Sequence, residues 1–400
     1  MPLMNPASSS VVPAALAALV DTIRDIYGAG PIPLHRPVFE GNERAYTVDC
    51  IDSNFVSSVG ARVAEFEATV AAFAGAAHGI ATVNGSAALH AALVVAGVER
   101  GDEVVTQALT FIATCNAISY AGARPVFVDV DPDTLGMSPA ALRRWLEANT
   151  RREGGRTVNA ATGARIAACM PMHTFGIPCR IAEIAALCDE FGLVLVEDTA
   201  ESLGSFVGAR HTGTFGTLAA FSFNGNKIVT TGGGGVIVTD DAELARRAKH
   251  LTTTAKRPHP YEFFHDEIGF NYRLPNLNAA LGVAQMEALP AMLAIKAEVA
   301  ARYRDFCAAH GLRFVAAPEG TTPNHWLNAI ILDDRAARDA FLEASNAAGV
   351  MTRPIWQLMS ELPMYADCQN DGLDNARWLV DRVVNLPSSV PDSEFGRLKA

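Results

Sequence analysis

Residues 221–235, with the sequence FSFNGNKIVTTGGGG, place one lysine and four consecutive glycines in a largely apolar segment. Lys227 follows a run that is typical of a buried strand, which rarely accommodates an unpaired lysine. A snorkelling lysine at a strand end is one interpretation, and a lysine that loses its proton near a desolvated core and attacks a carbonyl carbon is the other. The glycines favour the second, because they remove bulk where the backbone passes close to another group. A flexible hairpin turn is the simpler explanation for them, since GVIVTDD resumes as a strand.

Composition restricts the classes of protein that this chain resembles. Half of its 400 residues are hydrophobic, which indicates a globular protein with a sizeable core. The net charge of −11 disfavours nucleic acid as a partner. Seven cysteines with no CxxC pair disfavour disulfide scaffolds and zinc ribbons, so no metal is expected. We find neither a signal peptide nor an apolar run of membrane-spanning length, so we expect a disordered start, no membrane contact and a cytoplasmic protein.

Strand-like and helical segments alternate through most of the chain. The spacing predicts helices over 11–27, 62–73, 88–98, 138–150 and 180–192, and strands over 103–107, 124–131, 165–173 and 193–202. Near-continuous apolar strands that alternate with helices are typical of a mostly parallel sheet covered on both faces. We therefore predict an α/β protein with a three-layer αβα domain.

The pattern changes after about residue 285, where a long helix over 285–311 is followed by shorter elements. We predict an N-terminal helix and arm over 1–45, a large domain over 46–285, and a smaller C-terminal α+β domain over 286–400. Residues 150–164 read as a surface loop.

Several polar residues fall where predicted strands end. Asp198 ends one strand and His173 another, and NGSA at 84–87 opens a helix. Ligands gather at the carboxyl ends of parallel strands. Small residues at a helix start expose N–H groups to a phosphate, although Ser86 could simply cap the helix. Asp198 alone is more often a salt-bridge partner or a cap than a functional group.

Together these residues suit pyridoxal phosphate. That cofactor needs a lysine for its covalent attachment, a carboxylate for its ring nitrogen, phosphate donors at a helix start, and a flat apolar contact. The order of phosphate loop, Asp198 and Lys227 along a parallel sheet is that of the fold-type I enzymes.

Three longer segments carry a family resemblance. VEDTAESLGS, AFSFNGNKIVTTGGGGVIVTDD and GFNYRLPNLNAALGVAQME resemble the DegT/DnrJ/EryC1/StrS sugar aminotransferases, from about residue 31 to the C-terminus. PLHRPVFEGNERAYTVDCIDSNFVSSVG and TQALTFIATCNAISYAGARPVFVDVDPDTLGMSP are most similar to the LegC-type subgroup. The resemblance implies a fold-type I transferase that moves an amino group from L-glutamate to C4 of a nucleotide-linked 4-keto-6-deoxy-N-acetyl sugar. Such a reaction serves a bacterial surface glycan or nonulosonic acid.

The resemblance also assigns roles to residues. Lys227 matches the lysine that bonds to the cofactor and then moves the proton, and Asp198 matches the partner of the ring nitrogen. The remaining cofactor contacts implied are Gly85, Ser86 and Ala87 at the helix start, Ser222 as a hydroxyl donor, Phe111 against the ring, Glu201 near the ring hydroxyl, and Asn271 from the neighbouring subunit. An Asn271 that reaches across implies an obligate homodimer with shared active sites.

Charge and position suggest further residues for the substrates. We expect His173 to line the pocket, and a set of basic residues to bind the diphosphate or the glutamate carboxylate: Arg36, Lys256, Arg257 and Arg353. For each of the four, an ordinary surface salt bridge is an equal alternative. His325 and Trp326 could contact sugar or could pack between domains.

Two other functions stay open. One is different chemistry with the same cofactor, either dehydration of a sugar, which some relatives perform with a histidine in place of the lysine, or amination of an aminocyclitol. The other is a non-catalytic protein that keeps the fold. The retained Lys227 favours amino transfer. The nucleotide, the sugar, the stereochemistry of the amine, the pathway product and the size of the oligomer are not specified by the sequence.

Overall fold

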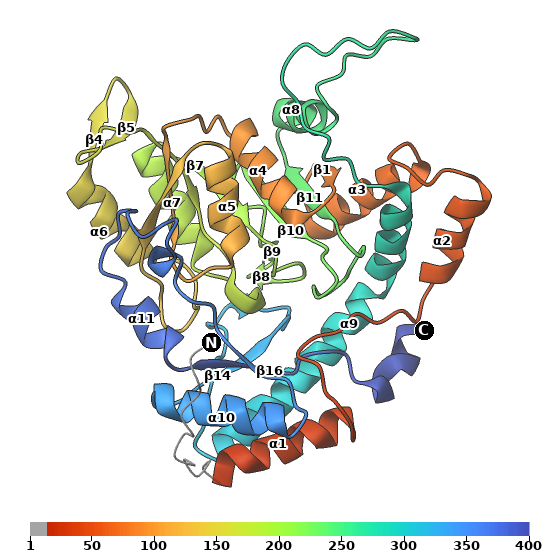
Figure 1. Cartoon of the computed structure of the whole chain (residues 1–400), viewed down its shortest axis with the longest axis vertical. Helices are drawn as coiled ribbons and strands as arrows, with labels where there is room; N and C mark the ends of the chain where they lie inside the picture. The colour runs from red at the N-terminus through yellow and green to blue at the C-terminus, as the bar shows by residue number, and fades with distance from the viewer. Residues whose placement is uncertain (1–13, 400) are drawn as a thin grey trace, which may run out of the picture.

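A seven-stranded sheet organises the larger part of the molecule (Figure 1). The structure is a computed structural model that describes residues 14–399, so the expected disordered start lies outside the described residues. The strand order is β1-β11-β10-β7-β6-β2-β3. The strands are β1 (His78–Thr82), β2 (Glu103–Gln107), β3 (Arg124–Val128), β6 (Ile166–Met170), β7 (Val194–Asp198), β10 (Leu218–Ser222) and β11 (Gly235–Thr239). β11 runs antiparallel to its neighbours, and the pairs from β10 to β3 are parallel, so the mostly parallel sheet is confirmed.

Helices cover both faces of this sheet, as the buried side chains show. Alternate strand residues such as Val104 and Val196 pack against α4 (Gly85–Val95), α5 (Ile112–Tyr120) and α8 (Ala242–Thr252). Their neighbours Val105 and Leu195 point the other way, toward α6 (Pro139–Asn149) and α7 (Ile181–Phe191). Near β11 that second face is covered by α3 (Ala61–Ala74) and α9 (Asn276–Ala309). The three-layer αβα arrangement follows from this alternation.

Local sequence accounts for several helix ends. Ser138 caps α6 by accepting a hydrogen bond from the Ala141 amide at 3.3 Å, and Pro139 occupies the first turn. Gly192 ends α7 with a φ of +67°, a left-handed conformation that glycine adopts without strain. Both features match the sequence-based expectation.

A second, smaller sheet follows the long helix. Its order is β12-β14-β16-β15, and all its pairs are antiparallel. These strands are β12 (Arg313–Phe314), β14 (Asn328–Ile331), β15 (Arg353–Pro354) and β16 (Val383–Leu386), with α10 (Arg335–Ala347) beside them. The N-terminal helix α1 (Ala14–Tyr27) packs into the same apolar cluster as α10, beneath the small sheet (Figure 1).

Several predicted boundaries differ from the structure, and the strands predicted over 124–131, 165–173 and 193–202 end earlier, at Val128, Met170 and Asp198. The long helix α9 begins at Asn276, directly after Pro275 in the N-cap position, rather than near 285, and it contains Pro290 as predicted. The predicted domain boundary at 285/286 therefore falls within a helix, and the division into domains stays a prediction. Residues 150–164 contain a hairpin of β4 (Thr150–Glu153) and β5 (Arg156–Asn159) instead of an irregular loop.

Among the residues that the structure describes, α9 alone is long and apolar enough to span a membrane. Charged residues interrupt it, so it contains no continuous apolar run of that length. Of its apolar window, 61% is buried inside the protein, as expected for a core helix. All seven cysteines are buried and free. The remaining elements are α2 (Glu43–Asp52), α11 (Asp374–Val380), β8 (Phe206–Val207), β9 (Arg210–His211), β13 (Thr321–Thr322), and the short helices Thr174–Gly176, Met359–Glu361 and Asp392–Lys399.

Candidate active site

A cavity of about 320 Å³ lies where β7, β10 and the start of α4 meet Trp326 and Trp356, which lie next to strands of the smaller sheet. Its lining residues are Asn84, Gly85, Ser86, Leu89, Phe111, Ala113, Met172, Asp198, Ala200, Glu201, Ser222, Asn224, Asn226, Lys227, Trp326 and Trp356. The carboxyl ends of β7 and β10 thus bring together most of the polar groups that the sequence singled out. We call this space the cofactor cavity.

Lys227 lies in a turn five residues after β10 ends and directs its amine into the cofactor cavity. Its Nζ lies 3.2 Å from Glu201 Oε1 and 4.0 Å from the centroid of the Trp326 ring. The cation therefore has a carboxylate and an aromatic face as partners, which accounts for a nearly buried lysine here.

Glu201 accepts a second hydrogen bond, from the Phe175 amide at 2.9 Å. Burial disfavours the charged carboxylate and raises the pKa of Glu201 to about 7. The positive charge of Lys227 lowers this pKa, but its effect is smaller than that of burial. Near neutral pH, Glu201 is thus able to hold or release a proton beside the lysine.

Asp198 is the last residue of β7 and is buried. Its carboxylate accepts hydrogen bonds from Thr114 Oγ1 at 2.7 Å and from the Ala200 amide at 3.1 Å. Burial raises the pKa of Asp198, and these two donors oppose that shift. A buried carboxylate with donors on one side and a cavity on the other is suited to a cationic ring nitrogen.

The start of α4 meets the end of β10 at Gly85. A Cβ atom on Gly85 would lie 2.8 Å from the Ser222 Cβ atom, so only glycine permits this approach. Asn84 caps the helix by accepting from the Ala87 amide at 2.8 Å, so Ser86 does not serve as the cap. The Ala87 amide is engaged by Asn84 and Ala87 is not in the cavity lining, so Gly85 and Ser86 are the helix-start residues that face the cavity, and the expected phosphate contact of Ala87 stays a prediction.

These residues fit pyridoxal phosphate. A cavity of about 320 Å³ is within the range of small-molecule sites. Gly85 and Ser222 lie next to each other in the cavity lining, where the helix start and a hydroxyl group suit a phosphate. Asp198 and Lys227 supply the carboxylate and the amine that the cofactor requires. The glycine run also brings the backbone close, because a Cβ atom on Gly235 would lie 2.5 Å from the Asn84 carbonyl oxygen.

Two aromatic residues, Phe111 and Trp356, line the cavity. Phe111 precedes α5 and meets Trp356 edge to face, with ring centroids 6.3 Å apart. Phe111 is 47% exposed, so its ring is available to contact a ligand. This placement suits the stacking role that the family resemblance implies.

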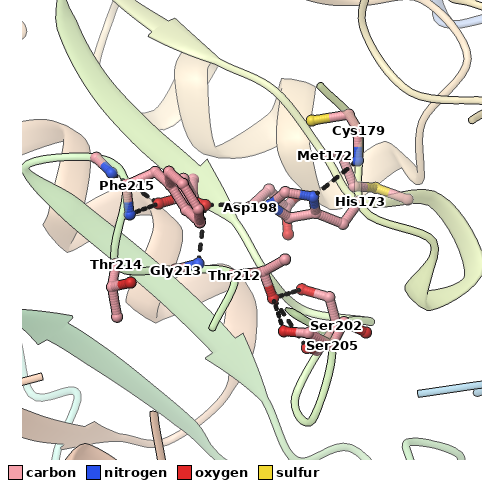
Figure 2. Close-up of polar contacts among 12 residues, drawn as sticks. Met172, His173, Cys179, Asp198, Ser202, Ser205, Thr212, Gly213, Thr214 and Phe215 are labelled. Carbon is pink, nitrogen blue, oxygen red and sulfur yellow. Dashed lines mark hydrogen bonds and ion pairs between the residues drawn. The ribbon is translucent and has the colours of Figure 1, made fainter. Parts of the chain in front are cut away.

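His173 does not line the cavity, contrary to expectation. Figure 2 shows its ring directed at the Cys179 amide, which donates to His173 Nδ1 at 3.2 Å. On the other side, Nε2 lies 3.1 Å from Glu197 Oε2. Glu197 also accepts backbone amides of Gly213, Phe215 and Gly216 at 2.7–2.8 Å. His173 is fully buried and packs the loop beneath the site, and a motif at a strand end could not reveal which way its ring turns.

Arg36, Lys256 and Arg257 also lie outside the cofactor cavity of their own chain, so their expected roles in substrate binding stay predictions. Arg36 forms an ion pair with Asp392 and lies over the Phe395 ring. Lys256 and Arg257 lie in the segment 256–270, outside the cofactor cavity of their own chain, where Lys256 contacts the Phe263 ring at 3.9 Å.

His325 lines a separate cavity of about 220 Å³. Arg353, in contrast, lines a cavity of about 560 Å³ that shares Asn226, Trp326 and Trp356 with the cofactor cavity. Arg353 thus stays a candidate for substrate binding.

Asn271 is exposed and accepts a hydrogen bond from Arg273 Nε at 3.0 Å. It is not part of the cofactor cavity of its own chain. Its expected contact with a phosphate in the neighbouring subunit stays a prediction.

Sequence reasoning missed Thr114, Asn226 and Trp356. Thr114 lies in the first turn of α5 and donates a hydrogen bond to Asp198. The only feature of the sequence that could have indicated this role is a hydroxyl residue three positions after Phe111. Asn226 accepts the indole N–H of Trp326 at 2.7 Å through its backbone oxygen, which no side-chain pattern discloses. Trp356 reaches the site from the segment that follows β15, so only the tertiary structure places it there.

Known proteins resemble this chain over most of its length. The profile of the DegT/DnrJ/EryC1/StrS aminotransferase family matches residues 38–392. The GDP-perosamine synthase of Caulobacter vibrioides is 35% identical over 361 residues, which cover 89% of this chain and 93% of that protein. The GDP-perosamine synthase of Vibrio cholerae is 34% identical, covering 89% and 94%. The crystal structure of DesI with its TDP-sugar product is 29% identical with a TM-score of 0.78, covering 90% and 88%.

The match therefore extends to both sequence and fold. The cofactor of this group of enzymes is pyridoxal phosphate, which the cavity fits. The structure and its relatives also confirm the fold-type I architecture expected from the sequence. This chain therefore belongs to the DegT/DnrJ/EryC1/StrS aminotransferase family, as a sugar aminotransferase.

Proposed function

We propose that this enzyme transfers an amino group from L-glutamate to C4 of a nucleotide-linked 4-keto-6-deoxy sugar. The observation that carries the proposal is the convergence of Lys227, Asp198, Gly85 and Ser222 on one cavity. Relatives named GDP-perosamine synthase and a solved relative with a TDP-sugar product support a nucleotide sugar as the acceptor.

Each residue has a distinct task in this proposal. Bound pyridoxal phosphate supplies an electron sink for the carbon that exchanges its amino group. Lys227 Nζ takes a proton from that carbon and returns it, which one mobile amine can do in both half-reactions. Asp198 keeps the ring nitrogen protonated. Glu201, 3.2 Å from Lys227, stabilises the amine when it carries the proton.

The acceptor has features that neither the fold nor the cavity specifies. The relatives favour GDP as the carrier, whereas the LegC-type resemblance favours an acceptor that bears an N-acetyl group. Arg353 lies beside the cofactor cavity and is the basic residue best placed for a carboxylate or a diphosphate.

The proposal includes a cytoplasmic homodimer. An exposed apolar set on the segment 256–270 projects beyond α8 (Figure 1) and consists of Tyr261, Phe263, Phe264 and Ile268. A further set on and after α2 consists of Val48, Ile51, Phe55, Val56 and Val59. Exposed apolar side chains in such number mark interaction surfaces. A second copy placed there would bring Asn271 toward the partner's cofactor.

The decisive experiment separates the two half-reactions. Holoenzyme is first mixed with L-glutamate alone, and the change in the visible cofactor band and the release of 2-oxoglutarate are recorded. The product of that step is then mixed with GDP- and UDP-linked 4-keto-6-deoxy sugars, with and without an N-acetyl group. NMR of the product identifies the aminated carbon and its stereochemistry.

We expect amination at C4 and no turnover by Lys227→Ala, which also loses the band of the covalently held cofactor. Dehydration of a sugar without consumption of glutamate would contradict the proposal. Amination of an inosose ketone but of no nucleotide sugar would also contradict it and favour the aminocyclitol alternative. A protein that binds no cofactor would favour a non-catalytic role.

A further inference from the structure

Trp326 contacts the reacting amine, and no step of the proposed reaction yet uses it. Its indole ring lines the cofactor cavity, and the ring centroid lies 4.0 Å from Lys227 Nζ. The side chain is 4% exposed and comes from the segment before β14, so only the tertiary fold brings it to the lysine. A buried aromatic face beside the group that moves the proton points to a role in the reaction.

Hydrogen bonds fix the position of the indole. Its Nε1–H donates to the backbone oxygen of Asn226, the residue before Lys227, at 2.7 Å. The Trp326 amide donates to Asn324 Oδ1 at 2.8 Å, and Lys296 Nζ lies 3.3 Å from the Trp326 carbonyl oxygen. The ring is therefore held against the turn that carries Lys227.

Asn324 connects the two partners of Lys227. Its Nδ2 donates to the backbone oxygen of Glu201 at 2.8 Å, while its Oδ1 accepts from the Trp326 amide. Asn324 is fully buried, and a Cβ atom on Gly176 would lie 1.8 Å from its Oδ1, so the surrounding backbone packs closely against it. The carboxylate and the indole thus keep fixed positions relative to each other, which is the preorganisation that a catalytic site requires.

The face of an indole ring distinguishes the two protonation states of an amine. The negative face attracts an ammonium group, and this attraction is stronger where water is excluded. A neutral amine carries no full charge and gains much less. The Lys227 side chain is 11% exposed, so the attraction acts here in a largely dry environment.

Glu201 alone does not balance the ammonium charge at every pH. Burial raises the pKa of Glu201 to about 7, so near neutral pH a large share of this carboxyl group is protonated and uncharged. The indole ring does not titrate, and its attraction for the ammonium group persists when Glu201 is neutral. Trp326 is therefore the partner of Lys227 that does not depend on pH.

We propose that Trp326 is a further catalytic residue, whose ring face stabilises Lys227 in the protonated state that follows proton removal from the substrate carbon. In that step the carbon–hydrogen bond breaks, the proton bonds to Nζ, and the electron pair passes into the electron sink that bound pyridoxal phosphate supplies. No further reactant is needed, because Nζ later gives the proton back. This inference rests on the proposed function and adds a residue to it.

Two substitutions separate the ring face from the N–H group. Trp326→Phe keeps an aromatic face and loses the N–H donor, whereas Trp326→Leu loses both. Trp378→Leu is the matched control, because the Trp378 ring centroid lies 4.7 Å from the guanidinium carbon of Arg382, outside the cofactor cavity. Each holoenzyme is mixed with L-glutamate that carries hydrogen or deuterium at its α-carbon, and the conversion of the cofactor is followed by absorbance in a single turnover.

We expect Trp326→Leu to slow the glutamate half-reaction about tenfold or more, with a deuterium isotope effect at least as large as that of wild type, because proton transfer itself is slowed. Trp326→Phe should stay within about threefold of wild type, since a phenyl face still attracts the ammonium group. Trp378→Leu should leave the rate and the isotope effect unchanged.

A second measurement uses the cofactor-free protein. Urea unfolding of wild type, Trp326→Leu, Lys227→Met and the double variant forms a double-mutant cycle for the two side chains. Trp326→Leu should lose less stability in the Lys227→Met background than in wild type, because the cation that favours the ring is then missing. Trp378→Leu should lose the same stability in both backgrounds. Additive losses for Trp326→Leu and Lys227→Met would overturn the inference.

Equal losses of rate in Trp326→Phe and Trp326→Leu would assign the effect to the N–H group or to packing, and would also overturn it. A slowed reaction whose isotope effect disappears would have the same consequence, since the loss would then lie in another step. If Trp326→Leu does not fold, Trp326→Met, which leaves less empty space, takes its place with the same expectations. Failure of the wild-type enzyme to react with L-glutamate is read first and overturns the proposed function instead, and the double-mutant cycle then decides alone whether Trp326 stabilises the protonated amine.

Discussion

Lys227 and Glu201 form a nearly buried ion pair, in which Nζ lies 3.2 Å from Oε1 and the two side chains are 11% and 2% exposed. The pair links the reacting amine to a group that titrates near neutral pH. Burial disfavours the Glu201 carboxylate more than the charge of Lys227 favours it, so the protonated form of Glu201 is favoured in the folded protein below about pH 7. The pair therefore couples the stability of the empty site to the protonation of its catalytic residue.

The stability of the cofactor-free enzyme should depend on pH through Glu201. Its pKa in the folded protein is about 7, above the ordinary value of 4.5, so folding favours its protonated form. Its contribution to stability is fully present below pH 4.5 and is lost as pH rises through 7. Relative to Glu201→Gln, the wild-type free energy of unfolding should fall by about 3 kcal/mol over this interval.

Urea unfolding at several pH values from about 4.5 to about 8 measures this difference. Glu319→Gln, at an exposed glutamate, serves as the control and should run parallel to wild type. A constant difference between wild type and Glu201→Gln across this range would contradict the assignment.

Gly85→Ala should weaken cofactor binding. The added Cβ atom would lie 2.8 Å from the Ser222 Cβ atom, so the start of α4 and the end of β10 must separate. We expect a loss of stability of about 1–3 kcal/mol, typical of overpacking, and roughly tenfold or greater weakening of cofactor binding. Absorbance titration of the cofactor-free protein measures the affinity. Gly396→Ala, where a Cβ atom meets open space, should behave as wild type, and equal affinity for both variants would refute the close approach.

Asp198→Asn should reduce activity by more than about a hundredfold, since the amide cannot hold a proton on the ring nitrogen.

Thr114→Val removes only the hydrogen bond of 2.7 Å to Asp198 and should reduce kcat by about tenfold. Thr106→Val is the matched control, because this buried threonine donates to the Met170 carbonyl oxygen instead. Steady-state kinetics and thermal melting together separate the two effects: Thr106→Val should lose stability but keep kcat. Equal kcat values for Thr114→Val and Thr106→Val would show that Thr114 does not act through Asp198.

The exposed apolar set on the segment 256–270 should stabilise the dimer. Phe263 and Ile268 are 79% and 88% exposed, which is unfavourable unless a partner covers them. The double variant Phe263→Ser/Ile268→Ser should shift a dimer toward monomer in sedimentation velocity and lose activity. Met364→Ser, at an exposed apolar residue outside this set, should leave the dimer intact. A wild-type protein that sediments as a monomer at every concentration would rule out the shared active site.

The sequence alone was sufficient for the α/β class and for the polar groups that follow strands. The fold class and these polar groups depend on residues that are close together in sequence. Apolar strands such as β2 and β6 alternate with helices whose capping residues can be identified from the sequence, as Ser138 can. Because parallel strands end at one edge, the strand pattern by itself predicts that Asp198 and Lys227 meet. The motifs around Lys227 also sufficed to indicate the family.

Only the tertiary structure decided which neighbouring polar residues face the site. Asp198 ends β7 and His173 follows β6 closely, yet the His173 ring points to the Cys179 amide and the Asp198 side chain points to the cavity. Trp356 and the pair of His35 and Lys296 come from segments far apart in the chain, so no local pattern links them. The direction of a side chain and the approach of distant segments depend on packing across the whole core, whereas strand and helix periodicity depends on neighbours in sequence.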